Sequence, residues 1–340
     1  MTATDVPLQL TKKEFTSDQE VRWCPGCGDY AILAAVQSLM PEFHRPPHEV
    51  VFVSGIGCSS RFPYYMDTYG FHTIHGRAPA IATGLAAARP DLDVWVITGD
   101  GDALSIGGNH FIHALRRNVN LKILLFNNQI YGLTKGQYSP TSEVGKVTKS
   151  TPFGSVDHPF NPVSLALGAE ATFVARSLDV DRPHLTDVLR RAYEHKGTAF
   201  VEIYQNCNIF NDGAFDLVTS RDSKGDYQIR LEHGKPIRFG NDGERGVIMS
   251  REGHCEVVDV ADVGEDRLLI HDEYADSPTL AFALSRLAQG PSQATPIGIF
   301  RDVTRSSYVE EVTRQLEDAQ TKGRGDLSKL LAGADSWRVE

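Results

Sequence analysis

Two polar clusters that directly follow apolar runs could together bind a cation and a diphosphate. Gly99-Asp100-Gly101-Asp102 follows one run, and Asn127-Asn128 follows the next. Glycine allows the backbone to turn sharply and to approach phosphate oxygens closely. An acid at position 100 would repel a diphosphate unless a cation lay between them, and Mg²⁺ coordinated by protein and phosphate oxygens meets that need. We therefore expect Asp100 and Asn128 to be ligands of one magnesium ion.

Two simpler interpretations compete with this site. Gly, Asp and Asn are ordinary turn residues, so turns at two strand ends would produce the same letters. A dinucleotide-binding fingerprint is disfavoured, because residues 99–104 lack the third glycine and place acids where the pyrophosphate would lie. The pairing of both clusters, each after a buried strand, favours magnesium. Its spacing resembles that of the diphosphate-binding half of thiamine diphosphate (TPP) enzymes.

The cysteines give a second signal. Cys24-Pro25-Gly26-Cys27 is a C-x-x-C loop, a pattern typical of a redox dithiol, half of a zinc site or half of an iron–sulfur site. Cys58 and Cys207 each follow a predicted strand, at the sheet edge where open α/β folds bind ligands. These two can therefore converge with the C-x-x-C pair, whereas Cys255 lies in a charged stretch and is left out.

Taken together, several segments closely resemble the β subunit of the 2-oxoacid:ferredoxin oxidoreductases. The resemblance runs in order over about residues 20 to 210. The segments that carry it are Trp23–Gly28, Gly55–Ser59, His72–Arg77, Gly99–Asp102 and Asn128–Gln137.

The resemblance implies three cofactors and the residues that hold them. One [4Fe-4S] cluster would be bound by Cys24, Cys27, Cys58 and Cys207. Mg²⁺ would be bound by Asp100, Asn128 and the carbonyl of Ile130. Contacts to TPP would come from Ile56, Gly57, Cys58, Ser59, His75, Gly76, Arg77, Ala78, Gly101, Asp102 and Leu133.

The implied reaction is oxidative decarboxylation of a 2-oxoacid, with coenzyme A taking the acyl group and ferredoxin the electrons. The extended C-terminal third resembles the longer β subunits that use 2-oxoglutarate, and Lys135 offers a catalytic-site cation for a substrate carboxylate. Pyruvate, or a broad range of 2-oxoacids, is the alternative. Lys12, Lys13 and Arg22 are candidates for docking ferredoxin.

A partner is expected because the sequence shows only one diphosphate-type half. The glutamate that activates TPP would then come from an α subunit, in an αβ or (αβ)₂ complex. Two rival functions remain: a cluster-free TPP decarboxylase or synthase, and a non-catalytic scaffold subunit stapled by a metal. The colour of the purified protein distinguishes the iron–sulfur enzyme from both rivals, since an iron–sulfur protein is brown, whereas a colourless protein that carries zinc supports either rival.

The predicted fold is α/β, a mostly parallel sheet with helices on both faces, followed by a C-terminal extension. We expect a cofactor-binding domain over 1–211 and the extension over 212–340, with 138–161 as a long loop and 323–340 partly disordered. Expected helices are 30–40, 78–88, 106–117, 162–167, 185–195, 278–287 and 308–319. Expected strands are 50–53, 93–98, 121–126, 171–175, 199–204 and 267–270.

Composition excludes some classes of function. The net charge of −10 over 340 residues argues against a nucleic-acid partner. No apolar run reaches the ~20 residues of a membrane span, and residues 1–7 show no signal-peptide pattern. Five cysteines, an odd number that includes a C-x-x-C, favour a reducing cytoplasm over a disulfide framework.

Overall fold

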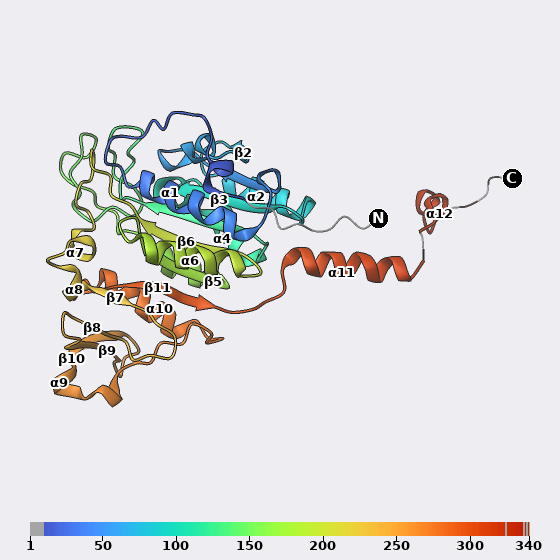
Figure 1. The fold of residues 1–340 in the computed structure, drawn as a ribbon. Helices are drawn as coiled ribbons and strands as arrows, with labels where there is room; N and C mark the ends of the chain where they lie inside the picture. The colour runs from blue at the N-terminus through green and yellow to red at the C-terminus, as the bar shows by residue number, and fades with distance from the viewer. Residues whose placement is uncertain (1–9, 324, 336, 338, 340) are drawn as a thin grey trace.

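The computed structural model describes residues 10–323, 325–335, 337 and 339. Within this part of the chain, an eight-stranded sheet has the order β2-β1-β3-β4-β6-β5-β11-β7 (Figure 1). Its strands are β1 (Val50–Ser54), β2 (Tyr69–His72), β3 (Asp93–Gly99), β4 (Lys122–Asn127), β5 (Phe173–Leu178), β6 (Ala199–Tyr204), β7 (Gln228–Arg230) and β11 (Thr295–Asp302). All neighbouring pairs are parallel except β5 and β11. The predicted mostly parallel sheet is confirmed.

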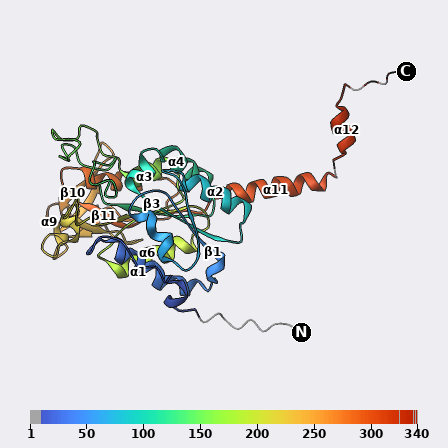
Figure 2. The ribbon, with the colours of Figure 1, turned by 90° about the horizontal axis from the view of Figure 1, so that it is seen from above.

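Helices cover both faces of this sheet (Figure 2). One face carries α2 (Ala78–Ala88), α4 (Gly108–Arg117), α5 (Pro162–Gly168) and α10 (Thr279–Arg286), and the other carries α1 (Asp29–Leu39) and α6 (Arg182–Glu194). A short helix, α3 (Asp100–Leu104), begins where β3 ends. The predicted helices overlap these elements, although the one expected from residue 106 begins at 108.

Alternation along the central strands divides the side chains between two hydrophobic cores. In β3, Val94 and Val96 pack beneath α2 and α4, whereas Trp95 and Ile97 pack on the opposite face. Successive side chains of a strand point to opposite faces, so a strand covered on both sides must be apolar throughout. The continuous apolar runs in the sequence have this origin.

In the described C-terminal part of the chain, the one strand that the sequence predicted is absent from the structure. Residues 267–270 form no strand: a 3₁₀ turn covers Glu265–Arg267, and Ile270 makes a single bridge to Pro236. The end of the segment instead pairs with residues 234–237: the Ile237 amide donates to the Leu269 carbonyl and the His271 amide donates to the Lys235 carbonyl, while the Leu269 amide donates to Val247. The strand prediction was therefore wrong there.

Residues beyond 212 also contribute to the main sheet, through β7 and β11. The sequence analysis missed β11, which pairs antiparallel with β5. The other strands form a small antiparallel sheet of β8 (Arg238–Phe239), β9 (Arg245–Met249) and β10 (Cys255–Asp259), with the short helices α7 (Asp216–Thr219), α8 (Lys224–Tyr227) and α9 (Val260–Val263) nearby in the chain. The region after the expected domain boundary at 212 therefore contributes strands to both the main sheet and the small antiparallel sheet.

The C-terminal helices α11 (Tyr308–Thr321) and α12 (Leu327–Ala332) extend away from the body of the protein (Figures 1 and 2). Neither helix has a buried residue. Of the tail expected to be partly disordered, 327–332 is helical, and positions 324, 336, 338 and 340 lie outside the described residues, as does the N-terminal segment 1–9. In the described part of the chain, no helix has the length and apolar character required to cross a bilayer.

Candidate functional site

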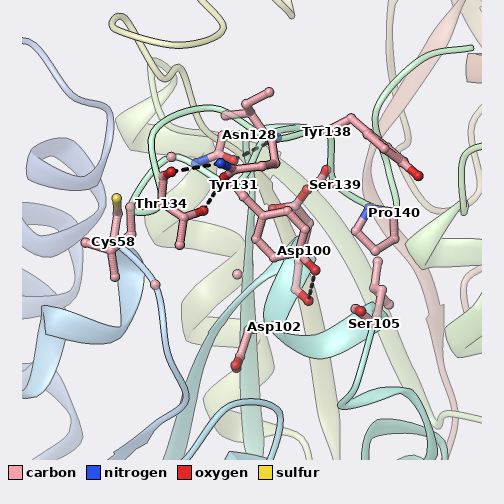
Figure 3. Close-up of a pocket in the computed structure, with 18 of the residues that line it drawn as sticks. Cys58, Asp100, Asp102, Ser105, Asn128, Tyr131, Thr134, Tyr138, Ser139 and Pro140 are labelled. Carbon is pink, nitrogen blue, oxygen red and sulfur yellow. Dashed lines mark hydrogen bonds between the residues drawn. The ribbon is translucent and has the colours of Figure 1, made fainter. Parts of the chain in front are cut away.

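A cavity of about 1040 Å³ opens where β1, β3 and β4 end. Its wall brings together many residues predicted from the sequence: Ile56, Gly57, Cys58, Ser59, His75, Asp100, Gly101, Asp102, Asn128, Ile130 and Leu133. Figure 3 shows Cys58 on one side of this pocket, Tyr138 and Pro140 on the other, and Asp100 between them. The two polar clusters identified in the sequence therefore line one cavity, as their positions at strand ends predicted.

Asp100 is a buried carboxylate at the floor of the pocket. It is 2% exposed, and its Oδ2 accepts hydrogen bonds from Ser139 Oγ at 2.5 Å and Thr141 Oγ1 at 2.6 Å. Burial raises the pKa of Asp100 to about 6, although the two hydroxyl donors oppose this shift. A carboxylate in this position gains from a cation that compensates its charge.

The neighbouring asparagines have different roles. Asn128 lines the pocket, and its amide donates to Gln205 Oε1 at 2.9 Å. Asn127 instead lies inside the sheet, 2% exposed, where its amide donates to Glu202 Oε1 at 2.7 Å. Of the pair, only Asn128 lines the pocket, where its Oδ1 accepts from the backbone amide of Ile130 at 3.2 Å.

Asp102 organises the pocket wall. Its Oδ1 accepts from the backbone amides of Ile56 at 3.0 Å and Gly76 at 2.7 Å, and lies 2.6 Å from His75 Nδ1. Its Oδ2 accepts from Thr98 Oγ1 at 2.7 Å. One buried carboxylate thus joins three segments of the wall, a role the sequence did not reveal.

Position 101 must be glycine because the Tyr131 ring lies against its backbone. The Tyr131 hydroxyl donates to the Gly101 carbonyl at 2.9 Å. A Cβ at position 101 would lie 2.2 Å from the Tyr131 ring, a distance that backbone and ring cannot accommodate without moving. The second glycine of the Gly-Asp-Gly motif therefore permits the aromatic ring to close one side of the pocket.

The four predicted cluster ligands, Cys24, Cys27, Cys58 and Cys207, lie on three segments of the chain. Hydrogen bonds connect these segments. The Trp23 indole donates to the Cys58 carbonyl at 2.7 Å, and Gln205 Nε2 lies 3.3 Å from Cys27 Sγ. A Cβ built on Gly132 would lie 3.5 Å from Cys58 Sγ and 3.6 Å from Cys207 Sγ, so both sulfurs approach the same point. Gly132 belongs to the segment that follows Asn128.

Two of these sulfurs, those of Cys27 and Cys58, occupy an environment that disfavours the thiolate form. Burial, reinforced by the nearby Asp29 carboxyl, raises the pKa of Cys58 to about 12 and that of Cys27 further. Asp29 is itself buried and makes no conventional hydrogen bond within the described residues, and burial raises its pKa to about 7. A metal centre would supply the positive charge that buried thiolates require.

The side chains as they stand do not form a closed metal site. Among the described residues, no group of three or more His, Cys, Asp or Glu side chains lies close enough to hold a metal ion. Cys24 is exposed, and the other three predicted cluster ligands are half-buried. The donor chemistry fits a sulfur-bound cluster and an oxygen-bound cation, and each requires its ligands to close around the metal.

Other predicted site residues lie outside the pocket. Lys135 is exposed, has a positive φ of 78° and does not line the cavity. Arg77 donates to the carbonyls of His75 and Ile106, and Gly76 and Ala78 lie buried beside it. The docking candidates Lys12 and Lys13 are exposed on a 3₁₀ turn.

Sequence reasoning missed Ser139, Thr141, Tyr131, Asp29 and Glu202. Ser139 and Thr141 belong to the long loop predicted over 138–161, and the available signal was that functional residues concentrate in such loops. Asp29, which directly follows the C-x-x-C-Gly segment, and Glu202, in an apolar strand, are single acids without a distinguishing pattern.

Comparisons with known proteins agree with this arrangement. The family of the thiamine pyrophosphate enzyme C-terminal TPP binding domain matches residues 55–203. The 2-oxoglutarate oxidoreductase subunit KorB of Mycobacterium tuberculosis is 61% identical over 99% of this chain and 90% of its own length. Subunit beta of 2-oxoacid:ferredoxin oxidoreductase 1 from Aeropyrum pernix is 47% identical over 56% of this chain and 60% of its own.

A solved structure extends the similarity along the whole chain. It is a 2-oxoglutarate:ferredoxin oxidoreductase from Magnetococcus marinus with 2-oxoglutarate, coenzyme A and succinyl-CoA bound. It aligns with a TM-score of 0.75 at 33% identity, over 96% of this chain and 97% of that one. The likeness therefore includes the region after the shared cofactor-binding segment.

Proposed function

The chain belongs to the β subunits of the 2-oxoacid:ferredoxin oxidoreductases, and we propose that it uses 2-oxoglutarate. The proposed reaction converts 2-oxoglutarate, coenzyme A and oxidised ferredoxin to succinyl-CoA, CO₂ and reduced ferredoxin, and is reversible. The resemblance predicted from sequence motifs is confirmed at the level of the family. The preference for 2-oxoglutarate is supported by the names of the full-length relative and of the solved neighbour.

The position of Cys58 is the main support for the proposal, because this residue belongs both to the cofactor pocket and to the group of cysteines. It lines the pocket that holds Asp100 and Asn128, and its sulfur approaches the same point as that of Cys207. A cluster bound by these cysteines would lie next to the cofactor pocket. Short separation is what transfer of single electrons from a cofactor-bound intermediate to a cluster requires.

Asp100, Asn128 and the carbonyl of Ile130 would hold Mg²⁺, and the backbone at Gly101 would approach the diphosphate. TPP, when bound, supplies the carbanion chemistry that removes CO₂ from a 2-oxoacid. The residues of this chain bind and orient the cofactor, and the pocket wall tied together by Asp102 excludes water. Cys24, Cys27, Cys58 and Cys207 would hold one [4Fe-4S] cluster.

An α subunit completes this site in the proposal. It would contribute the glutamate that activates TPP, in an αβ or (αβ)₂ complex. Ile56 and Leu133, which we assign to TPP, are 44% and 51% exposed at the pocket, and bound TPP together with a partner would cover this apolar surface. All five cysteines are free thiols, and this suits the reducing cytoplasm in which we place the complex.

The experiment that tests the proposal is cofactor analysis of the αβ complex purified without oxygen. We expect bound TPP, Mg²⁺, iron and acid-labile sulfide, with broad absorbance near ~400 nm. A colourless complex that carries TPP but no iron would favour a cluster-free TPP decarboxylase or synthase. A complex with zinc and no TPP would favour a metal-stapled scaffold subunit.

A further inference from the structure

The hydroxyl groups of Ser139 and Thr141, both in the long loop, donate hydrogen bonds to Asp100, the carboxylate that we assign as a ligand of the cation. Ser139 and Thr141 are 2% and 3% exposed, as deeply buried as Asp100 itself. Both bond the same oxygen, Oδ2, at 2.5 and 2.6 Å. Oδ1 is therefore the oxygen that Asp100 can offer to a cation. Hydrogen bonds to a charged acceptor are short and strong, and they fix its orientation.

The sheet interior holds this arrangement from the other side. Thr141 Oγ1 also lies 2.9 Å from Asn127 Oδ1, so its single proton is shared between that oxygen and Asp100 Oδ2, and the Asn127 amide donates to Glu202 Oε1 at 2.7 Å. Glu202 is fully buried and is paired with Arg176 at 2.7 Å. The position of Thr141 is therefore set by buried polar groups that are paired with one another.

The segment that contacts Asp100 continues into the pocket wall. Pro140, between the two hydroxyl residues, accepts a backbone hydrogen bond at 2.8 Å from Phe160, at the far end of the loop. Pro140, His158 and Phe160 all line the cavity. A movement of Ser139 or Thr141 would therefore displace the wall that faces the reacting groups.

We propose that Ser139 and Thr141 are positioning residues that orient Asp100 for the cation, and that cation binding is thereby coupled to the conformation of residues 138–161. The inference rests on the proposed function for the identity of the cation. A cation on Oδ1 and the two hydroxyls on Oδ2 hold the same planar carboxylate, so each fixes the orientation that the other requires. The loop is then held more tightly when the cation is bound.

The test uses the αβ complex stripped of TPP and Mg²⁺. TPP binding is measured by calorimetry as a function of Mg²⁺ concentration for Ser139→Ala, Thr141→Val and Thr141→Ser. We expect the first two variants to require about ten- to hundredfold more Mg²⁺, the usual effect of losing an outer-shell partner of a metal ligand. Thr141→Ser keeps the hydroxyl and should bind Mg²⁺ like the wild type.

Matched controls come from the same loop. Thr148 and Ser150 bond to each other at 3.2 Å, so Thr148→Val and Ser150→Ala remove hydroxyls that do not contact Asp100. These variants should leave the Mg²⁺ requirement unchanged. Hydrogen exchange over 139–142 and 158–160 gives a second readout: Mg²⁺ with TPP should slow it in the wild type, and less so in Ser139→Ala.

The outcomes separate this inference from the proposed function. Wild-type complex that binds TPP without Mg²⁺ would overturn the proposed cation site itself. Mg²⁺-dependent binding in the wild type with an unchanged requirement in Ser139→Ala and Thr141→Val would overturn only the positioning role. Where Thr141→Val does not fold, Ser139→Ala and Thr141→Ser decide the result.

Discussion

Arg176 and Glu202 form an ion pair in the centre of the sheet, with 2.7 Å between Arg176 Nε and Glu202 Oε2 and side chains 1% and 0% exposed. The pair connects distant parts of the fold. Arg176 also donates to the carbonyl of Pro296 in β11, while the second carboxylate oxygen of Glu202 accepts from Asn127. The C-terminal strand and the cation site thus share one buried polar network.

The first prediction concerns the stability that this pair provides. Arg176→Met leaves the Glu202 charge buried without its cationic partner, and should lower the free energy of unfolding by about 3–5 kcal/mol. The double variant Arg176→Met, Glu202→Gln removes both charges and should recover a large part of the loss. Chemical denaturation of the single and double variants measures this difference. A single variant as stable as the wild type would show that the pair is not a stabilising unit.

The second prediction concerns Asp102. Asp102→Asn replaces an acceptor oxygen with an amide that donates. At least one of the four groups that now contact the Asp102 carboxylate therefore loses its hydrogen-bond acceptor. TPP affinity of the complex, measured by calorimetry, should fall at least about tenfold, since unpaired buried donors cost about 1–3 kcal/mol each. Asp157→Asn is the matched control, because Asp157 lines the same pocket but is exposed. Equal losses in both variants would contradict the organising role.

The third prediction concerns the cysteines. Replacing Cys24, Cys27, Cys58 or Cys207 singly with serine should lower bound iron and abolish viologen reduction, because serine is a poor ligand for iron–sulfur clusters. Cys255→Ser should change neither, since Cys255 lies in β10 of the small antiparallel sheet. Iron analysis of purified complexes measures the effect. Normal iron content in Cys207→Ser would remove that residue from the site.

The fourth prediction decides which cation meets the substrate carboxylate. From the sequence, Lys135→Ala should lower kcat/KM for 2-oxoglutarate more than about tenfold, since an unpaired buried carboxylate is costly. His158 lines the pocket, whereas Lys135 does not. Steady-state kinetics of Lys135→Ala and His158→Ala, with Lys149→Ala as a control from the same loop, separate the two residues. A loss confined to His158→Ala would transfer the role to His158.

The parts of the fold that the sequence predicted share one physical basis. Strands such as β3 and β4 are apolar throughout because helices cover both faces, and the polar residues that follow them, Asp100 and Asn128, must meet at one edge. The sequence motifs, the predicted strands and the position of the strand ends therefore all predict a site at this edge of the sheet.

The parts that were missed depend on tertiary contacts. β11 pairs with a strand more than a hundred residues earlier in the chain, and no local pattern encodes that pairing. Ser139 and Thr141 are ordinary loop residues by composition, and only the folded chain places them on Asp100. The run 267–270 is mostly apolar like a strand, yet only its end pairs with the chain, through a single bridge between Ile270 and Pro236.

We propose that this chain is the β subunit of an enzyme specific for 2-oxoglutarate. The most direct measurement compares kcat/KM for 2-oxoglutarate and pyruvate in the αβ complex, with coenzyme A and ferredoxin present. We predict a preference for 2-oxoglutarate of at least about tenfold, because a site built for a second carboxylate leaves its cation unpaired when pyruvate binds. Equal efficiency with pyruvate would contradict the claim.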